Sequence, residues 1–154
     1  MDVHSPAKRS FNMSKIRSTN TKPELLVRRG LFARGLRYRL HYKSLPGRPD
    51  LVFPKWQAIV QVHGCFWHGH ARCARFKEPA DNRSYWSVKI EKNRERDVSN
   101  EAAWTERGWR VLTIWECALV GRHRLILSDV LDRAQSFIEG KDFALTIRSA
   151  NGHP

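Results

Sequence analysis

Cysteines, acidic residues and long apolar runs are all scarce in this chain of 154 residues. No stretch approaches the roughly 20 consecutive apolar residues that a membrane-spanning helix needs. The opening segment, MDVHSPAKRSFNM, has no hydrophobic core of the kind that a secretory signal carries. The three cysteines are an odd number, which argues against a disulfide framework. These absences predict a cytoplasmic or nucleoid-associated protein, and argue against a membrane protein or a disulfide-stabilised secreted one.

The scarcity of acidic residues gives the chain a strong positive charge. Its 15 Asp and Glu residues face 28 Lys and Arg residues, for a net charge of +13 and a pI near 10.4. Such an excess predicts a polyanionic partner, and nucleic acid is the usual one. A solvated basic surface without a partner is the alternative. The basic residues are spread along the chain and interleaved with six tryptophans, which favours nucleic acid.

The chain has no internal repeat and no low-complexity block, so its fold class follows from the order of its predicted elements. TKPELLVRRGLFARG is a predicted helix, with Thr21 as N-cap, Pro23 in the first turn and Glu24 at the capping-box position. Then come predicted strands over 38–42, 50–53, 56–62 and 109–115, a polar helix over 84–107, and a last helix from Ser128 to Gly140. This order predicts a single α/β domain with a mixed sheet covered by helices, and residues 141–154 as a loose tail.

Two of these strands, DLVF and WQAIVQV, are joined tightly at Pro54-Lys55 and are expected to form an antiparallel hairpin. Asp50 opens the first strand. Side chains alternate along a strand, so Gln61 and His63 share one face near the end of the second. The turn brings that end back beside Asp50, and a carboxylate near a backbone carbonyl and a histidine suits Mg²⁺ binding and proton transfer. The hairpin alone does not separate this interpretation from an aspartate that merely begins a strand.

The segment VHGCFWHGHARC, residues 62–73, is dense in possible metal ligands. It holds three histidines, two cysteines, a phenylalanine and a tryptophan within twelve residues. This segment contains Cys65 and Cys73, and Cys117 lies far away in sequence. One histidine added to these three cysteines would make a closed structural zinc site of the Cys₃His type. Spacing alone does not choose between His68 and His70, and three ordinary buried thiols are the alternative.

Phe66 and Trp67 are consecutive in this polar, ligand-rich loop. If both were core residues, the backbone between two metal ligands would have to bury both of its faces. Insertion of the rings into a base stack explains them better. Wedges of this kind unstack a base step for a few kcal/mol, and a mispair lowers that cost.

Five segments resemble, in the same order, the Vsr-type very-short-patch-repair DNA mismatch endonucleases. They are RSFNMSKIRSTNTKPE, GRPDLVF, VHGCFWHGH, YWSVKIEKNRERD and GWRVLTIWEC, and the resemblance runs from about residue 8 to about residue 138. It implies a restriction-endonuclease-like fold of the PD-(D/E)xK type, with a mixed central sheet flanked by helices and one structural zinc site. Gln61-Val62-His63 stands where the acidic-x-lysine element of that fold would be. The lysine is absent, so a histidine would have to supply the proton chemistry.

For the cutting site, the resemblance implies that Asp50 and the main-chain carbonyl of Val62 hold Mg²⁺. His68 would be the general base that activates water, and His63 would assist, since an imidazole has its ordinary pKa near neutrality. Glu24 would orient one of these histidines, although the capping box also explains it. Related sequences can have threonine in place of Val62, and valine serves equally if only the carbonyl binds.

The resemblance also implies roles on the long helix. Asn93 and Asp97 are four residues apart, which places them on one face of the helix. They would contact the residues of the cutting site without contacting the DNA themselves. A solvated helix face is the alternative for this pair. Trp86 would be a third ring beside Phe66 and Trp67 in the DNA, with packing of the helix on the sheet as its alternative.

For zinc, the family pattern selects His70 together with Cys65, Cys73 and Cys117. One departure from the pattern concerns the spacing. Two residues, Ala71 and Arg72, separate His70 from Cys73 where the pattern has one.

The activity implied is a strand-specific nick at a T:G mismatch. Mg²⁺-dependent hydrolysis of the phosphodiester 5′ of the mismatched thymine would leave a 5′-phosphate and begin very-short-patch repair. The lesion arises when 5-methylcytosine deaminates, so a cytosine-5 DNA methyltransferase and mismatch-repair proteins are the expected cellular partners of this bacterial monomer. Residues 1–20 would be an N-terminal arm that contacts DNA, and 21–140 the endonuclease domain. The alternatives are a related nuclease with another DNA target and a non-catalytic, zinc-stabilised DNA-binding module.

Overall fold

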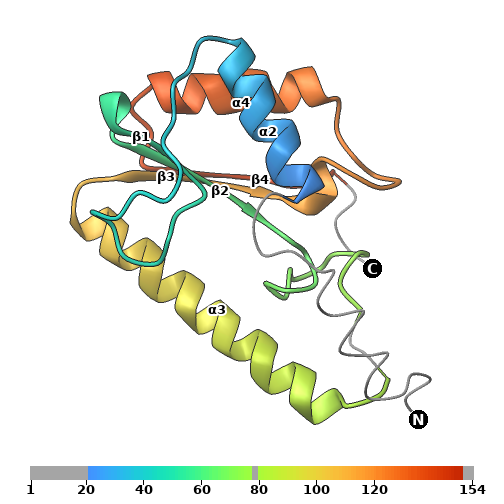
Figure 1. Cartoon of the computed structure of the whole chain (residues 1–154). Helices are drawn as coiled ribbons and strands as arrows, with labels where there is room; N and C mark the ends of the chain where they lie inside the picture. The colour runs from blue at the N-terminus through green and yellow to red at the C-terminus, as the bar shows by residue number, and fades with distance from the viewer. Residues whose placement is uncertain (1–20, 78–79, 151–154) are drawn as a thin grey trace.

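A four-stranded mixed sheet with helices on both faces forms the centre of the molecule (Figure 1). The computed structural model describes residues 21–77 and 80–150, so the predicted arm over 1–20 lies outside the described residues. The elements are, in chain order, α2 (Lys22–Ala33), β1 (Leu51–Phe53), the short helix η1 (Pro54–Trp56), β2 (Ala58–His63), α3 (Arg83–Glu106), β3 (Arg110–Trp115), the short helix η2 (Glu116–Ala118), α4 (Leu127–Glu139) and β4 (Ala144–Ile147). The mixed α/β class predicted from the sequence is confirmed.

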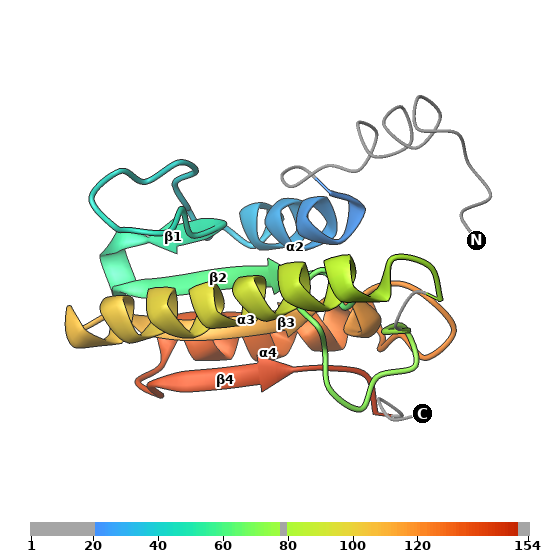
Figure 2. The same ribbon diagram turned by 90° about the horizontal axis from the view of Figure 1, so that it is seen from below.

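The sheet has the strand order β1-β2-β3-β4. β1 runs antiparallel to β2, as expected for the hairpin, while β3 runs parallel to β2, and β4 parallel to β3. The central strands are apolar because they are covered on both sides. Helices α2 and α4 lie on one face (Figure 1), and α3 lies on the other, running along β2 and β3 (Figure 2).

Each face of the sheet has its own apolar core. The larger one joins α2 and α4 to the sheet through side chains such as Leu31, Leu112 and Phe137. The smaller one lies under α3, where Trp104 packs on Val52 and Ile59. The long helix is therefore anchored near its C-terminal end, and its N-terminal half extends past the sheet (Figure 1). Within residues 21–77 and 80–150, none of the helices is both long and apolar enough to cross a membrane.

The helix boundaries agree with the predicted capping residues at the start of α2 and the end of α4, but not at the start of α4. Thr21 is the N-cap of α2, and its hydroxyl accepts a 3.4 Å hydrogen bond from the Glu24 N–H. α4 begins at Leu127, so Ser128 lies inside its first turn instead of capping it, and Gly140 is the C-cap. The long polar helix is α3, within a residue of its predicted ends.

Two predicted segments are corrected. The strand expected over 38–42 is reduced to one isolated bridge between Arg39 and Val52, because His41 has a φ of +52° and ends the extended conformation. The loose tail expected over 141–154 is wrong for Ala144–Ile147, which form β4 at the edge of the sheet. Four residues with mixed exposure give too short an alternation for this edge strand to be predicted.

Candidate active site and metal cluster

The ends of β1 and β2 form the first part of the site, as the hairpin predicted. The Asp50 carboxylate accepts a 2.7 Å hydrogen bond from the Val62 N–H. Loss of contact with water raises the pKa of the Asp50 carboxyl from 3.8 to about 7; the Val62 hydrogen bond opposes the rise and the nearby Glu24 charge adds to it. Glu24 is itself buried, with 6% of its surface exposed. Two carboxyl groups in one poorly solvated place are a favourable setting for a cation.

Two stacked histidines form the second part. The rings of His63 and His68 lie 3.8 Å apart between centroids and are parallel within 1°. Burial, with the His68 charge as a second cause, lowers the pKa of His63 to about 3, so this imidazole is neutral at physiological pH. His68 Nδ1 is 2.6 Å from the Asp97 carboxylate of α3. A carboxylate that holds one ring nitrogen leaves the other nitrogen for proton transfer, as in other histidine–aspartate pairs.

Asn93 and Asp97 lie on one face of α3, as their spacing predicted, and both contact the loop. Asn93 Nδ2 donates a 2.9 Å hydrogen bond to the Trp67 carbonyl. Asp97, four residues further along α3, contacts His68. Helix α3 therefore fixes two consecutive residues of the loop. The carboxylate at hydrogen-bonding distance from His68 is that of Asp97. The orienting role that the resemblance implied for Glu24 stays a prediction.

The third part of the site is the Cys₃His cluster, whose four residues are all buried. One ligand atom from each of Cys65, His70, Cys73 and Cys117 lies within 4.8 Å of the others. His70 Nδ1 is 3.5 Å from Cys65 Sγ and 3.7 Å from Cys117 Sγ. Of the two histidines that spacing left open, the geometry favours His70, which joins the three thiols while His68 contacts Asp97. A closed set of three thiols and one imidazole suits a structural zinc ion.

One thiol of the cluster, that of Cys117, is poised to lose its proton. A hydrogen bond from Cys65 lowers the pKa of the Cys117 thiol to about 4, and the Ser149 N–H adds to this. The same pairing raises the pKa of Cys65. A thiolate is the form of cysteine that binds metal, so the cluster already favours the charge that a cation needs.

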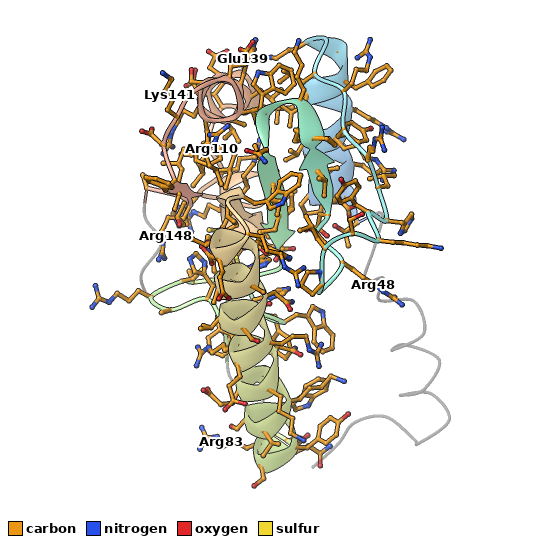
Figure 3. The ribbon with its side chains drawn as sticks, turned by 90° about the vertical axis from the view of Figure 1, so that its left-hand side faces the viewer. Arg48, Arg83, Arg110, Glu139, Lys141 and Arg148 are labelled. Atoms are coloured by element: carbon orange, nitrogen blue, oxygen red, sulfur yellow. The ribbon has the colours of Figure 1, made fainter. Side chains whose placement is uncertain are left out.

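Two arginines accommodate the two-residue spacing between His70 and Cys73: Arg72, through its left-handed backbone, and Arg148, through its hydrogen bonds. Arg72 has a φ of +54°, which turns the extra residue outward. The Arg148 guanidinium, labelled in Figure 3, donates hydrogen bonds of 3.1 and 2.7 Å to the carbonyls of Ala71 and Arg72. The segment that follows β4 therefore holds the loop in place.

Three rings form an aromatic cluster at the junction of the loop and α3. Phe66, Trp67 and Trp86 contact one another edge to face, with centroids 5.2 to 5.5 Å apart. All three are half-buried. Trp86 contacts the loop rings, which favours the interpretation that grouped it with them over packing on the sheet. Lys89 Nζ lies 5.8 Å from the centroid of the Trp67 ring, and a cation beside partly exposed rings suits a phosphate backbone.

Some residues that build the site escaped the sequence reasoning. Trp115 stacks on His70 with centroids 3.8 Å apart, and the Glu116 carboxylate accepts the Cys65 N–H at 3.1 Å. They are the two residues before Cys117, so their proximity in sequence to a predicted ligand was the available signal. Arg94, beside Asn93, donates a 3.1 Å hydrogen bond to the Gly69 carbonyl. This contact depends on the position of the loop, which the sequence does not reveal.

Comparison with known proteins gives a consistent result. A family described as "DNA mismatch endonuclease Vsr" matches residues 1–75. The chain is 48% identical over 133 residues to the type II nicking enzyme V.XorIIP of Xanthomonas oryzae pv. oryzae, covering 85% of this chain and 97% of that protein. It is 44% identical over 132 residues to the type II nicking enzyme V.NmeAIP of Neisseria meningitidis serogroup A, covering 86% and 92%. It is 41% identical over 152 residues to the DNA mismatch endonuclease Vsr of Escherichia coli K12, covering 99% and 97%.

Proposed function

The chain belongs to the Vsr DNA mismatch endonuclease family, and from this membership we propose that it nicks one DNA strand at a T:G mismatch. Membership establishes a family of DNA endonucleases and nicking enzymes. The observation that carries the proposal is the proximity of Asp50 to His68 and Asp97, whose charges affect the pKa of Asp50, together with the stacking of His63 on His68. A non-catalytic DNA-binding module would leave this arrangement without a use.

The residues at the end of β2 fit Mg²⁺ in their chemistry. The Asp50 carboxylate and the Val62 carbonyl would hold the ion, because Mg²⁺ prefers oxygen ligands and takes the remainder from phosphate and water. A bound Mg²⁺ supplies charge stabilisation at the phosphate and makes water easier to deprotonate. The raised pKa of Asp50 agrees with a carboxylate whose negative charge is poorly stabilised until a cation binds beside it.

The proton chemistry falls to the histidines. Asp97 holds Nδ1 of His68, which leaves Nε2 to accept a proton from the attacking water. The water oxygen bonds to phosphorus, the bond from phosphorus to O3′ breaks, and O3′ leaves with a proton from solvent. The products are a 5′-phosphate and a 3′-hydroxyl at the nick. In the cell, this nick would begin very-short-patch repair of deaminated 5-methylcytosine, together with mismatch-repair proteins and beside a cytosine-5 methyltransferase.

A second candidate is a nuclease of this family with another DNA target. Relatives at 44% and 48% identity are named as type II nicking enzymes and not by a mismatch. The discriminating experiment measures nicking rates with zinc-loaded protein and Mg²⁺ on a panel of duplexes: T:G, C:G, T:A, unmodified recognition sites and a flap. We expect T:G to be nicked fastest. Equal or faster cleavage of a matched duplex would establish the other target.

Removal of the carboxylate behind His68 is expected to impair chemistry more than binding. Asp97→Asn should lower the nicking rate at saturating enzyme by about 100-fold or more, because general acid–base catalysis contributes roughly 10²–10⁴-fold. Duplex affinity should hold, since it depends on the basic surface. Glu95→Gln, the same loss of charge at an exposed site on the same helix, is the control. Equal rates for Asp97→Asn and Glu95→Gln would remove Asp97 from the mechanism.

The aromatic cluster is expected to enter the DNA at the mismatch. Trp67→Ala should keep the fold and zinc but lose at least about tenfold in activity on T:G duplex, about 1.4 kcal/mol, since stacking on one base is worth ~1–3 kcal/mol. The loss should be smaller on a duplex already distorted by an abasic site. Rates are compared at fixed ionic strength, because the charge of +13 makes affinity depend steeply on salt.

The control for the aromatic cluster is Phe143→Ala. This ring is 80% exposed and lies just before β4, beside the start of β3. It should leave nicking unchanged. If Trp67→Ala nicked the T:G duplex at the same rate as the parent protein, Trp67 would only pack within the protein.

A further inference from the structure

A polar pair interrupts the apolar centre of the sheet. Gln61 of β2 and Thr113 of β3 lie directly opposite each other in the parallel register, and they are 5% and 8% exposed. Buried amide and hydroxyl groups cost free energy unless they form hydrogen bonds, and an apolar pair would fill these positions without that cost. Neither side chain contacts the Cys₃His cluster or the aromatic cluster in the hydrogen bonds described. The pair therefore has a purpose other than packing.

The hydrogen bonds of the pair lead to the site. Gln61 Nε2 donates a 2.9 Å hydrogen bond to Thr113 Oγ1. This directs the other end of the amide, Oε1, toward His63, whose Nε2 lies 3.0 Å away. An amide oxygen can only accept a hydrogen bond, so the proton of the neutral His63 ring belongs on Nε2.

The other ring nitrogen of His63 is then an acceptor. Nδ1 is buried and has no hydrogen-bond partner within the part of the chain that the structure describes. The ring is held between His68, stacked at 3.8 Å, and Trp115, edge to face at 5.2 Å. If the Gln61 amide were reversed, Nδ1 would carry the proton and be a donor. The orientation of one buried amide thus decides which kind of hydrogen bond His63 can make.

We propose that Gln61, held by Thr113, is a positioning residue that fixes the Nε2–H tautomer of His63 and so keeps Nδ1 as an acceptor for a water or hydroxyl proton at the site. The proposal rests on the proposed function for its purpose, since a nuclease must hold and deprotonate water beside the phosphate. The tautomer itself does not depend on which DNA is cut. Removing the partner that fixes the ring nitrogen of a metal-ligating histidine typically costs about 10–100-fold in activity, and we expect an effect on the same scale for His63.

The test is nitrogen NMR of zinc-loaded, ¹⁵N-labelled protein without Mg²⁺, which distinguishes protonated from unprotonated ring nitrogens. The His63 signals are identified by their loss in His63→Gln. In the parent we expect Nε2 protonated and Nδ1 unprotonated. In Gln61→Met, a replacement of similar shape without an acceptor, we expect the Nδ1–H tautomer to appear. Thr113→Val should give a mixture, and Thr113→Ser should restore the parent spectrum because it keeps the hydroxyl.

Kinetics supply the second readout. Gln61→Met should lower kcat for nicking by about 10-fold to 100-fold with little change in KM, while Thr113→Ser stays near the parent. An Nδ1–H tautomer in the parent, or an unchanged His63 spectrum in Gln61→Met, overturns the proposal. If Gln61→Met does not fold, an unchanged spectrum in Thr113→Val overturns it instead. A protein that nicks no DNA in the panel but shows the predicted spectra would contradict the proposed function and leave the tautomer assignment in place.

Discussion

Asp50→Asn is expected to abolish nicking and, in buffer without Mg²⁺ above pH 7, to make the protein more stable. The catalytic loss follows because an amide replaces the one carboxylate that hydrogen-bonds Val62 at the proposed ion site. The oxygen of the introduced amide can still accept the Val62 N–H, so the hairpin should keep its shape. Duplex binding should change little, because the basic surface that sets affinity is untouched. Asp50→Ala should lose nicking in the same way.

The gain in stability follows from the sign of the pKa shift. The pKa of Asp50 is raised in the folded state from 3.8 to about 7, so between these values the folded protein binds a proton that the unfolded chain does not. Stability from this group is therefore highest below about pH 4, decreases as pH rises, and is lowest above about pH 7. At about 1.4 kcal/mol per pH unit, the full cost of the charge is at most about 4 kcal/mol. Asp50→Asn removes that cost and its slope with pH.

Thermal or urea unfolding between pH 4 and 9 measures this effect. His63 acts in the opposite direction, since its lowered pKa makes the folded state lose stability as pH falls below about 6.5. The comparison is therefore parent against variant at each pH. Asp142→Asn, the same change at an exposed site, is the control. Substantial nicking by Asp50→Asn at saturating Mg²⁺, or a stability difference that does not grow with pH, would contradict the assignment of this residue.

Cys117→Ser is expected to lose bound zinc and to unfold or aggregate. A structural zinc site forms only in the folded state, so its binding free energy contributes to folding, at roughly 10–16 kcal/mol for zinc-finger peptides. Cys117 follows β3, and Cys65 and Cys73 bracket the loop that carries Trp67 and His68. The ion would thus fix the loop to the sheet. Elemental analysis of protein purified without chelator should give one zinc per chain for the parent and less for the variant.

A pair of histidine variants provides the matched control. His70→Asn should lose zinc, as Cys117→Ser does. His68→Asn should keep both zinc and the fold, while its nicking rate falls. Both changes remove an imidazole from the same loop, two residues apart. No zinc in the parent, or full stability of Cys117→Ser, would mean that the cysteines are ordinary buried thiols. Zinc loss by His68→Asn alone would reassign the fourth ligand.

Local patterns in the sequence were enough to predict the contacts that depend on one hairpin or one helix. Alternation along a strand and a tight turn placed Val62 beside Asp50, and helical spacing put Asn93 and Asp97 on one face. These two inferences needed only the geometry of a single element. Side-chain chemistry identified the three cysteines as candidate zinc ligands, but it left His68 and His70 open, and the family pattern selected His70.

Contacts that depend on packing between distant elements could not be predicted. The pairing of Gln61 with Thr113 follows from the register of two parallel strands joined through a 24-residue helix, and nothing local fixes that register. The same holds for Arg148, which reaches the loop from beyond β4. The stacking of His63 on His68 depends on the bend of the loop around the thiols. Edge strand β4 was missed because four residues carry little alternation.

We propose above all that the Asp50 site cuts one strand of a mismatched duplex. The most direct measurement labels the two strands of a T:G duplex differently and maps the products with and without Mg²⁺, using Asp50→Ala alongside the parent. The predicted result is one nick, in the thymine strand, 5′ of the mismatched T, with a 5′-phosphate, only with Mg²⁺ and only in the parent. Cleavage of both strands, a nick in the guanine strand, or equal product from parent and Asp50→Ala would contradict the account.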